Sequence, residues 1–600
     1  MNFSGKTGRL AVAAAMAILL GGTGCVKTDG TLGQDYIPSS HIWKVATVSF
    51  DIDCIDMEKA SELGGYSSKR VAIGGVYDNE FGWSERVSAF PLIPVVDTLT
   101  FQMPEDAECL SFHFAIGKDT LSFREASQES IIQRIRVYEL THPLDNDIIY
   151  AGRLNFSGTD SDINKYRDDK GNLIELYDPA KGVVTEGCPT YIGGDSLSFN
   201  FKKSFGQKYL DALKEMKLGS VTEYAKKLPG VIIRCDRDLG SGRINLFQTA
   251  VTTDDYNYLT GNYATMRYRA TFDERGPIDT SIVFLLGLSG MIDSATSTLP
   301  TQYAFNFSTS QSNPASASAE DLFIEGGCGL KPVIRSIPLK SQIENAISEI
   351  VRESIPDYDL MSPDEQKTAM KEKRSQVIVN RATVFMPYQY DAEFTMVEKY
   401  PKVLSPTCRI RGKRTISDGE GGTIEQDVIS FAGLTDASVA NENQGDINRS
   451  MNRYQPDISH HVQELIRMEE TGSHEEYVEK MAKYDIWMLI MHPETTTTSS
   501  SGDSSYNDYL NALAYSSYYN NLYGYGGYGY GSYGYGYDSY YNNYYNYMMM
   551  AAYASQSSTT TTSSVELDKD RYYNCHLYGT GTSGVGKRPK LTITFSYPKE

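Results

Sequence analysis

The feature that most restricts the possible folds of this chain is an alternation of apolar and polar residues with a period of two. Successive side chains of a strand point to opposite faces, so this alternation predicts strands with one buried face. In the segment 591–597, for example, Leu591, Ile593, Phe595 and Tyr597 share one face. The same pattern occurs in Trp43 to Ile52, Arg134 to Leu140, Thr265 to Phe272 and Tyr303 to Phe307. Polar turn-forming stretches separate these runs, and together they predict a mainly β fold of antiparallel sheets.

Helices are predicted to be a minority, packed on or between the sheets. Ser362, Pro363 and Glu365 form the signature of a capping box with proline at the first helical position, which opens a helix through about Ser375. The other candidate helices are Gln207 to Met216, Ser341 to Ser354, Ile458 to Met468 and His474 to Lys483.

The domain organisation follows from length and from one internal likeness. A chain of 600 residues, 40% of them hydrophobic, has room for about two to four domains with real cores. Ile132 to Tyr138 and Val379 to Phe385 share the order aliphatic, amide, arginine, apolar, polar, valine, aromatic. This favours two jelly-roll-like sandwiches, although any two buried strands share much of such a pattern. We expect a first sandwich region at 41–300 and a second at 301–494 together with 565–600.

Residues 495–564 differ in composition from the rest of the chain. They hold only three charged residues, and the stretch Tyr523 to Tyr547 alone contains twelve tyrosines. Such a segment lacks the aliphatic side chains that make a core. Because strand-like residues precede and follow it, we predict a low-complexity insertion in a loop of the second sandwich. It is either a solvated spacer or an adhesive loop whose tyrosines stack on sugars or on a partner.

The N-terminus reads as an export signal. Lys6 and Arg9 precede an apolar run from Leu10 to Leu20, which is about half the roughly 20 residues that a membrane span needs. Small residues then lead to Cys25, as at the lipidation site of a bacterial lipoprotein, although Gly22 stands where leucine is usual. We predict a signal peptide at 1–24, lipid on Cys25 and a tether at 25–40. The alternative is a secreted protein cut nearby, without lipid.

Charge and cysteine content limit the partners. A formal net charge of −20 opposes binding to nucleic acid, which requires clustered Lys and Arg. Besides Cys25 the chain has seven scattered cysteines without a CxxC pair, so most are expected to be small buried hydrophobes, with one or two disulfides at most.

Motifs of catalysis and metal binding are incomplete. Gly581 to Arg588 matches the start of a phosphate-binding loop, but Arg588 replaces the Ser or Thr and a strand follows, so we predict a glycine-rich hairpin turn. His474 begins a zincin-like motif whose second histidine is Val478, and the adjacent His460 and His461 diverge on a helix. Asp160 opens a calcium-like spacing that lacks its turn glycine and final glutamate. We predict no catalytic, cofactor-binding or metal site.

Several segments carry a resemblance to a known family: TDGTLGQDYIPSS, GGVYDNEFGWSERVSAF, IIQRIRVYEL, SFGQKYLDALK and the ending KRPKLTITFSYPKE. Together they resemble the envelope lipoproteins of the phylum Bacteroidota grouped as a domain of unknown function, number four-two-seven-zero. The resemblance covers about Thr28 to Glu600, implies an envelope lipoprotein, and carries no assigned activity or functional residues. KRPKLTITF is also similar to the last strand of jelly-roll modules in extracellular adhesive and carbohydrate-associated proteins.

These observations predict a non-catalytic binding or structural lipoprotein, attached to the outer membrane through the lipid on Cys25, with a glycan or a protein as partner. The alternative is a carbohydrate-binding accessory of a glycan-uptake system, and a glycoside hydrolase comes third. Exposed aromatic residues on one sheet face would favour binding, whereas a deep cleft with convergent carboxylates would favour an enzyme.

Overall fold

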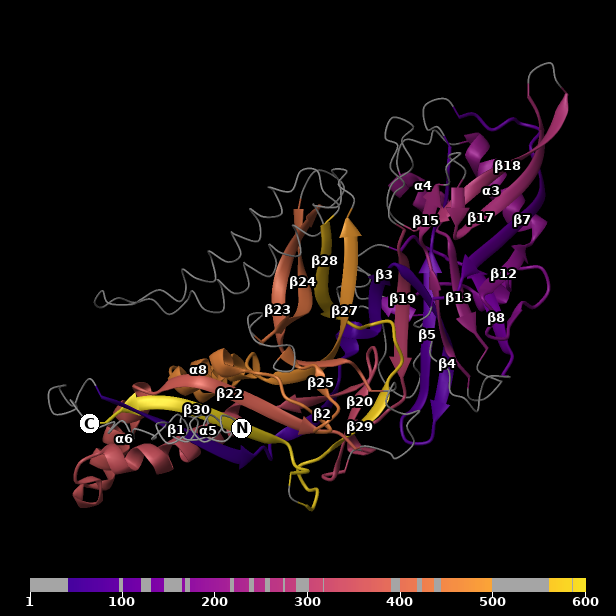
Figure 1. Cartoon of the computed structure of the whole chain (residues 1–600). Coiled ribbons are helices and arrows are strands. Elements are labelled where there is room, and N and C mark those ends of the chain that lie inside the picture. The colour runs from indigo at the N-terminus through magenta and orange to yellow at the C-terminus, as the bar shows by residue number, and fades with distance from the viewer. Residues whose placement is uncertain are drawn as a thin grey trace, which may run out of the picture.

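Antiparallel strands, most of them in four large sheets, form most of this computed structural model (Figure 1). The fold is therefore mainly β with few helices, as the alternation predicts. The structure describes residues 42–96, 101–119, 131–144, 165–167, 173–215, 221–236, 242–253, 259–272, 276–287, 302–316, 318–389, 400–417, 423–435, 444–498, 560–584 and 586–599.

Two facing sheets make up the first half, here called the N-terminal lobe. The eight-stranded sheet contains β3 (Gly65–Ser68), β4 (Arg70–Asp78), β5 (Gly82–Phe90), β8 (Gln133–Glu139), β11 (Thr190–Tyr191), β13 (Val231–Cys235), β14 (Ile244–Gln248) and β19 (Ala304–Ser310). The five-stranded sheet has the order β12 (Ser196–Phe201), β7 (Glu108–Gly117), β17 (Tyr263–Thr271), β18 (Pro277–Leu286), β6 (Leu92–Pro94). Two short pairs flank them, β9 (Lys165–Arg167) with β10 (Leu173–Glu175) and β15 (Val251–Thr253) with β16 (Leu259–Gly261).

The core of the N-terminal lobe is aromatic. Phe90 of one sheet stacks on Phe114 of the other, with ring centroids 5.7 Å apart. Helix α3 (Lys203–Glu215) adds Phe205 and Tyr209 to this core, and the short α4 (Val221–Lys227) adds Tyr224. Two sheets that share one core in this way form a β-sandwich. The jelly-roll connectivity stays a prediction.

The C-terminal lobe, as we call the second half, also has two large sheets. The six-stranded sheet contains β2 (Ile55–Lys59), β21 (Leu330–Ile334), β23 (Val403–Ser417), β24 (Thr423–Gly433), β27 (Ile486–Thr498) and β28 (Thr560–Leu567). The five-stranded sheet has the order β1 (Trp43–Asp51), β30 (Lys590–Pro598), β22 (Ile378–Pro387), β26 (Arg453–Tyr454), β25 (Ile447–Asn448). A short pair, β20 (Asp321–Glu325) and β29 (Asn574–Tyr578), lies next to the N-terminal lobe (Figure 1).

Helices lie along the inner face of the β1–β30–β22 sheet, some in contact with its strands and others packed on those helices. They are α5 (Ser336–Val351), α6 (Pro363–Ser375), α8 (Ser459–Arg467) and α9 (His474–Ala482). The capping box at Ser362 is present, with the Ser362 backbone N–H donating to Glu365 at 2.8 Å, so this sequence prediction is confirmed. Ile343 and Ile347 of α5 and Leu465 of α8 share a core with Phe595 of β30.

The boundary between the two sandwich regions is wrong in the sequence prediction. We expected 41–300 to form the first region, but β1 pairs with β30, and β2 pairs with β21, both in the C-terminal lobe. Conversely β19, expected in the second region, pairs with β5 in the N-terminal lobe. Alternation shows that a strand has one buried face, but it does not show which distant strand lies beside it.

The tyrosine-rich segment lies outside the described residues, but its ends do not. The threonine-rich tracts on either side were predicted to belong to the insertion and instead extend strands β27 and β28, which pair from Met491↔Leu567 to Thr498↔Thr560. Residues 499–559 therefore begin and end at one end of an antiparallel strand pair. These polar tracts can form strands because the backbone groups that face the neighbouring strand find hydrogen-bond partners across the pair.

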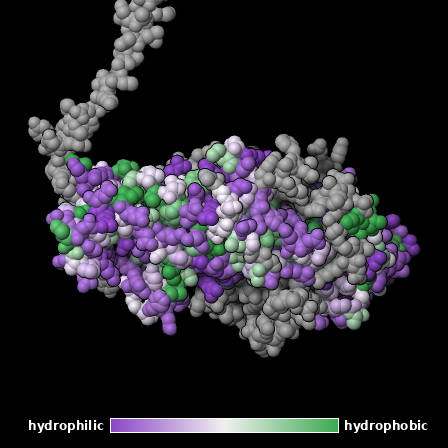
Figure 2. All heavy atoms as spheres, turned by 90° about the horizontal axis from the view of Figure 1, so that it is seen from below, coloured by the Kyte–Doolittle hydropathy of each residue, from purple (hydrophilic) through white to green (hydrophobic). Residues whose placement is uncertain are grey.

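Two further features complete the outline. Among the described residues, no helix has both the length and the apolar content that crossing a membrane requires. The face in Figure 2, seen from below relative to Figure 1, is mainly hydrophilic, with hydrophobic side chains in small separate patches.

Candidate functional site

The outward face of the β1–β30–β22 sheet is the strongest candidate for a binding surface. Along β30 the side chains of Leu591, Ile593 and Phe595 are fully buried against the helices. Thr592 and Thr594 alternate with them and point to the opposite, outward face. One face of this sheet thus belongs to the core, and the other is a polar surface.

Hydroxyl groups from neighbouring strands meet across this outward face. The Thr47 and Thr594 hydroxyl oxygens lie 3.0 Å apart, and the Ser49 and Thr592 hydroxyls 2.9 Å apart. Each hydroxyl has one donor and two acceptor positions, so a cross-strand bond leaves capacity for a ligand. The face therefore offers a row of small donors and acceptors that a polyhydroxyl ligand could use.

A β-bulge in β22 determines which side chains reach this face. Val379 pairs with Phe595 and Arg381 with Thr594, so Asn380 is one extra residue between them. If the same sequence formed a regular strand without the bulge, Asn380 would lie opposite Thr594 and Arg381 opposite Ile593, so that Arg381 would point into the core. The Asn380 amide instead donates to the Ser596 hydroxyl at 2.7 Å. The bulge thus places a cation on the outward face while Ala382 and Val384 stay buried.

Next to the bulge the face is hollowed. A shallow hollow of about 270 Å³ is lined by Arg381, Thr383, Phe385, Arg453, Gln455, Thr592 and Thr594. Small-molecule clefts usually hold about 300–1,000 Å³, so this hollow suits one ring or one terminal group. None of these described lining residues is an acid, a histidine or a cysteine, so the hollow has no pair of groups for acid–base catalysis.

Arg453 forms one wall of the hollow. Its guanidinium carbon lies 4.3 Å from the centroid of the Phe385 ring, a cation–π contact. Its Nε donates to the Gln455 side-chain oxygen at 3.1 Å, which fixes the plane of the guanidinium. Partial burial of this cation lowers its pKa from the ordinary value. An arginine held in this way presents its two terminal nitrogens in a fixed orientation.

The far end of the same face is apolar. Trp43 is 44% exposed, Val45 66% and Ile378 47%. Trp43 is opposite Pro598 in the register, and Val45 and Ile378 are both opposite Ser596. The outward face therefore runs from an exposed aromatic platform, over the hydroxyls, to the arginine-lined hollow.

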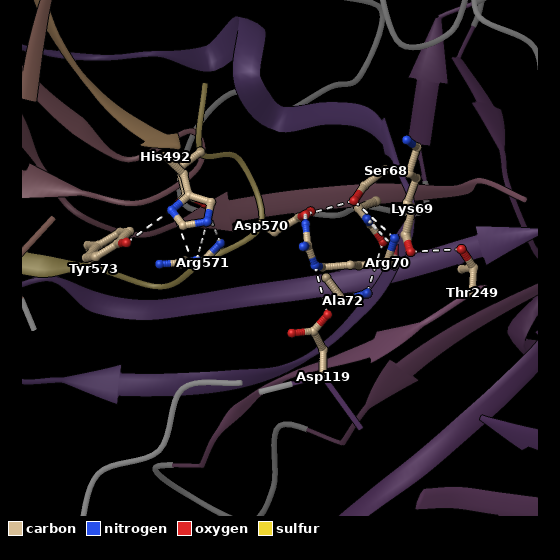
Figure 3. Close-up of polar contacts among 12 residues, drawn as sticks. Ser68, Lys69, Arg70, Ala72, Asp119, Thr249, His492, Asp570, Arg571 and Tyr573 are labelled. Atoms are coloured by element: carbon tan, nitrogen blue, oxygen red, sulfur yellow. Dashed lines mark hydrogen bonds and ion pairs between the residues drawn. The ribbon is translucent and has the colours of Figure 1, made fainter. Parts of the chain in front are cut away.

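A second polar cluster joins the two lobes, as Figure 3 shows. Arg70 of β4 pairs with Asp119 at 3.0 Å and with Asp570 at 3.4 Å, and the Ser68 hydroxyl donates to Asp570 at 2.8 Å. Burial raises the pKa of Asp570. Asp570 precedes β29, so this cluster ties the N-terminal lobe to the last strands of the chain. We assign it a structural role because both carboxylates are almost fully buried and engaged by neighbours.

The same junction contains a fully buried lysine and glutamate. Glu325 accepts hydrogen bonds from the Ser310 hydroxyl and the Leu330 backbone, each at 2.8 Å. Lys331 donates to the backbone oxygens of Gly327 and Gly329, and burial lowers its pKa to about 8. Each of the two buried charged groups thus has its own hydrogen-bond partners at the contact between the lobes, as buried charges must.

The histidines of the incomplete metal motifs lie in different environments. His461 is buried and its Nε2 lies 3.1 Å from the Tyr484 backbone oxygen, whereas His460 is exposed. His474 lies at the start of α9, exposed, with Nδ1 3.1 Å from Glu470. Among the described residues, no group of three His, Cys, Asp or Glu side chains is placed to hold a metal ion.

The remaining sequence predictions have mixed outcomes. Residues 581–588 link β29 to β30, which lie in different sheets, so the predicted hairpin turn is wrong. Five of the seven cysteines described are buried and none of the seven is in a disulfide, which confirms that most are small hydrophobes. The signal peptide, Cys25, the tether and Asp160 lie outside the described residues.

Sequence reasoning did not nominate the residues of the hollow. Arg381 and Phe385 stood in the internal repeat and were interpreted only as strand residues. The signal that was missed is the break in alternation at Asn380 and Arg381, which is typical of a bulge. Arg453 is on a two-residue strand, too short for any periodic pattern to show.

Comparisons with protein-family models, with curated proteins and with solved structures gave no match for this chain.

Proposed function

We propose that this chain is a non-catalytic lipoprotein of the cell envelope that binds a glycan on the outward face of the β1–β30–β22 sheet. The observation that carries the proposal is the open sheet face lined by hydroxyls, with an arginine-walled hollow at one end and Trp43 at the other. Sugars present hydroxyl groups at their edges and C–H groups on their faces. Side-chain hydroxyls, an amide and guanidinium groups match the edges, and aromatic rings match the faces.

The binding proposal is tested with Phe385→Ala in the full-length protein in detergent. Binding is measured by electrophoresis through gels that contain soluble polysaccharides, in which a bound protein migrates more slowly. We expect retardation that Phe385→Ala weakens, because the ring supports Arg453 and lines the hollow. The matched control is Tyr77→Ala, an aromatic residue 51% exposed on the N-terminal lobe. Equal retardation of both variants, or none for the unmodified protein on any polysaccharide, would contradict this function.

The proposed lipid anchor has its own test. Cys25→Ala removes the thiol that would carry the lipid, and we expect the variant to move from the detergent phase to the aqueous phase in detergent partitioning. The lipid would hold the unmodified protein in the detergent phase, because each buried methylene of its chains adds about 0.8 kcal/mol of membrane affinity. Membrane association that survives this substitution would refute the lipoprotein proposal. It would leave the glycan proposal standing, because the two rest on different residues.

A further inference from the structure

We infer that the hollow takes an anionic group, a carboxylate or a sulfate on a sugar, so that the glycan bound on this face is acidic. The inference rests on the proposed function and adds the chemical class of the ligand. It is carried by the charges of the hollow and by the hydrogen-bonding state of Arg453.

The lining of the hollow carries two cations, Arg381 and Arg453, and no anion among its described residues. The chain as a whole has 76 acidic and 56 basic side chains, so a surface patch without an acid and with two arginines departs from the average of this protein. Asp457, which does not line the hollow and is nearly buried, has its Oδ2 3.9 Å from the Arg381 Nε. The local charge therefore has the opposite sign to that of the protein.

Arg453 is the stronger of the two donors. Among the described residues no carboxylate lies within ion-pair distance of it, and its only side-chain hydrogen bond is the one from Nε to Gln455. Within the described part of the chain its terminal nitrogens therefore have no acceptor, and the ring of Phe385 on one side keeps water from one face of the guanidinium. A planar guanidinium with two parallel N–H groups matches the two oxygens of a carboxylate or a sulfate.

The hydroxyl floor distinguishes a sugar from a simple anion or a lipid headgroup. Thr383, Thr592 and Thr594 lie beside the arginines, where they match the hydroxyls that flank an acidic group on a sugar ring. An anionic bilayer would meet the whole protein, whose net charge of −20 opposes approach to such a surface. A single acidic sugar in the hollow interacts mainly with the local cations, since salt screens charges beyond about 8 Å.

The experiment is calorimetric titration of the full-length protein in detergent with three soluble polysaccharides: polygalacturonate, dextran sulfate and neutral dextran. We expect binding of one or both acidic polymers at least about 10-fold tighter than that of dextran, and weaker binding as salt is raised. A preference for polygalacturonate identifies a carboxylate ligand, and a preference for dextran sulfate identifies a sulfate. Equal affinity for dextran overturns the anionic assignment and leaves the glycan proposal intact.

Variants locate the site. Arg453→Met keeps the length and packing of the side chain, and we expect it to weaken binding of the acidic polymer by about 10-fold or more, because a charge-assisted hydrogen bond is lost. The control is Arg449→Met, an exposed arginine in the turn between β25 and β26 that does not line the hollow. Equal losses in both variants would mean nonspecific attraction and would overturn the inference. If thermal unfolding shows Arg453→Met to be misfolded, Arg381→Met replaces it with the same expected loss.

Vesicles that contain an anionic phospholipid provide the last arm. Binding to these vesicles that Arg453→Met abolishes, without binding to either acidic polysaccharide, would assign the hollow to a lipid headgroup and overturn the sugar. Absence of binding to every polysaccharide would overturn this inference together with the proposed function.

Discussion

Replacing His461 should change how the stability of the C-terminal lobe depends on pH. His461 lies on α8, is 1% exposed, and its Nδ1 has no hydrogen-bond partner among the described residues. Burial, the largest cause, lowers its pKa from 6.5 to about 4, and the contact with the Tyr484 backbone oxygen opposes this shift only partly. The imidazole is therefore neutral in the folded protein at pH values where it is already protonated in the unfolded chain.

The sign and size of the effect follow from this difference. Between pH 6.5 and about 4 the unfolded state binds more protons than the folded state, so the free energy of unfolding falls as the pH falls. One pKa unit corresponds to about 1.4 kcal/mol, and the shift of about two and a half units predicts a loss of roughly 2–3 kcal/mol between pH 7 and pH 4.5. Above pH 6.5 the imidazole is mainly neutral in both states, so the pH has little further effect on the free energy of unfolding through this group. Burial raises the pKa of Asp568 and Asp570, which contribute with the opposite sign in acid.

The assay is urea unfolding at pH 7, 5.5 and 4.5, followed by tryptophan fluorescence, for the parent protein and for His461→Gln. Because the carboxylates are common to both, the difference between the two pH profiles isolates the histidine. We expect the parent to lose about 2–3 kcal/mol more than His461→Gln over this range. His460→Gln, an exposed neighbour on the same helix, should follow the parent. Coincident profiles for the parent and His461→Gln would refute the reasoning.

Two further predictions concern the core and the tyrosine-rich segment. Phe595→Ala removes a fully buried ring from the inner face of β30 and should lower the free energy of unfolding in urea by about 3–5 kcal/mol. The control Val45→Ala, on the exposed face, should change it by no more than about 0.5 kcal/mol. Similar losses in the two variants would mean that the two faces are misassigned. Replacing 499–559 by Asn-Gly should leave the melting temperature nearly unchanged. Thr498 and Thr560 are already paired, so a two-residue turn can join them. Loop length also affects the entropy of loop closure only logarithmically. Unfolding of that variant would show that the segment contributes to the core.

Local features of the fold could be predicted from the sequence because they depend on a few neighbouring residues. The capping box at Ser362 places two reciprocal hydrogen bonds within one turn, so four residues determine where α6 begins. The faces of β30 followed from the alternation of Leu591, Thr592 and Ile593.

Features that depend on distant residues could not be predicted. The partner of β1 is 547 positions away at the Thr47–Thr594 contact, and many strands of this chain have the same alternation. The hollow needs Arg381 from one strand and Arg453 from another, brought together by a bulge whose effect appears only when the register with β30 is known. Net charge and composition describe the average of the chain, whereas the lining of the hollow has two arginines and no acid among its described residues.

The pairing of β1 with β30 also sets the order in which the chain is able to fold. Among the described residues β1 pairs only with β30, so it has no partner strand until a segment 547 positions later, at the Thr47–Thr594 contact, has been made. Until then the inward side chains of β1, such as Val48 and Phe50, lack the surface that they pack against in the native core. Contacts so far apart in sequence form slowly, and unpaired strands aggregate. The C-terminal lobe therefore closes late, and during that interval β1 is a strand that a chaperone would protect from aggregation.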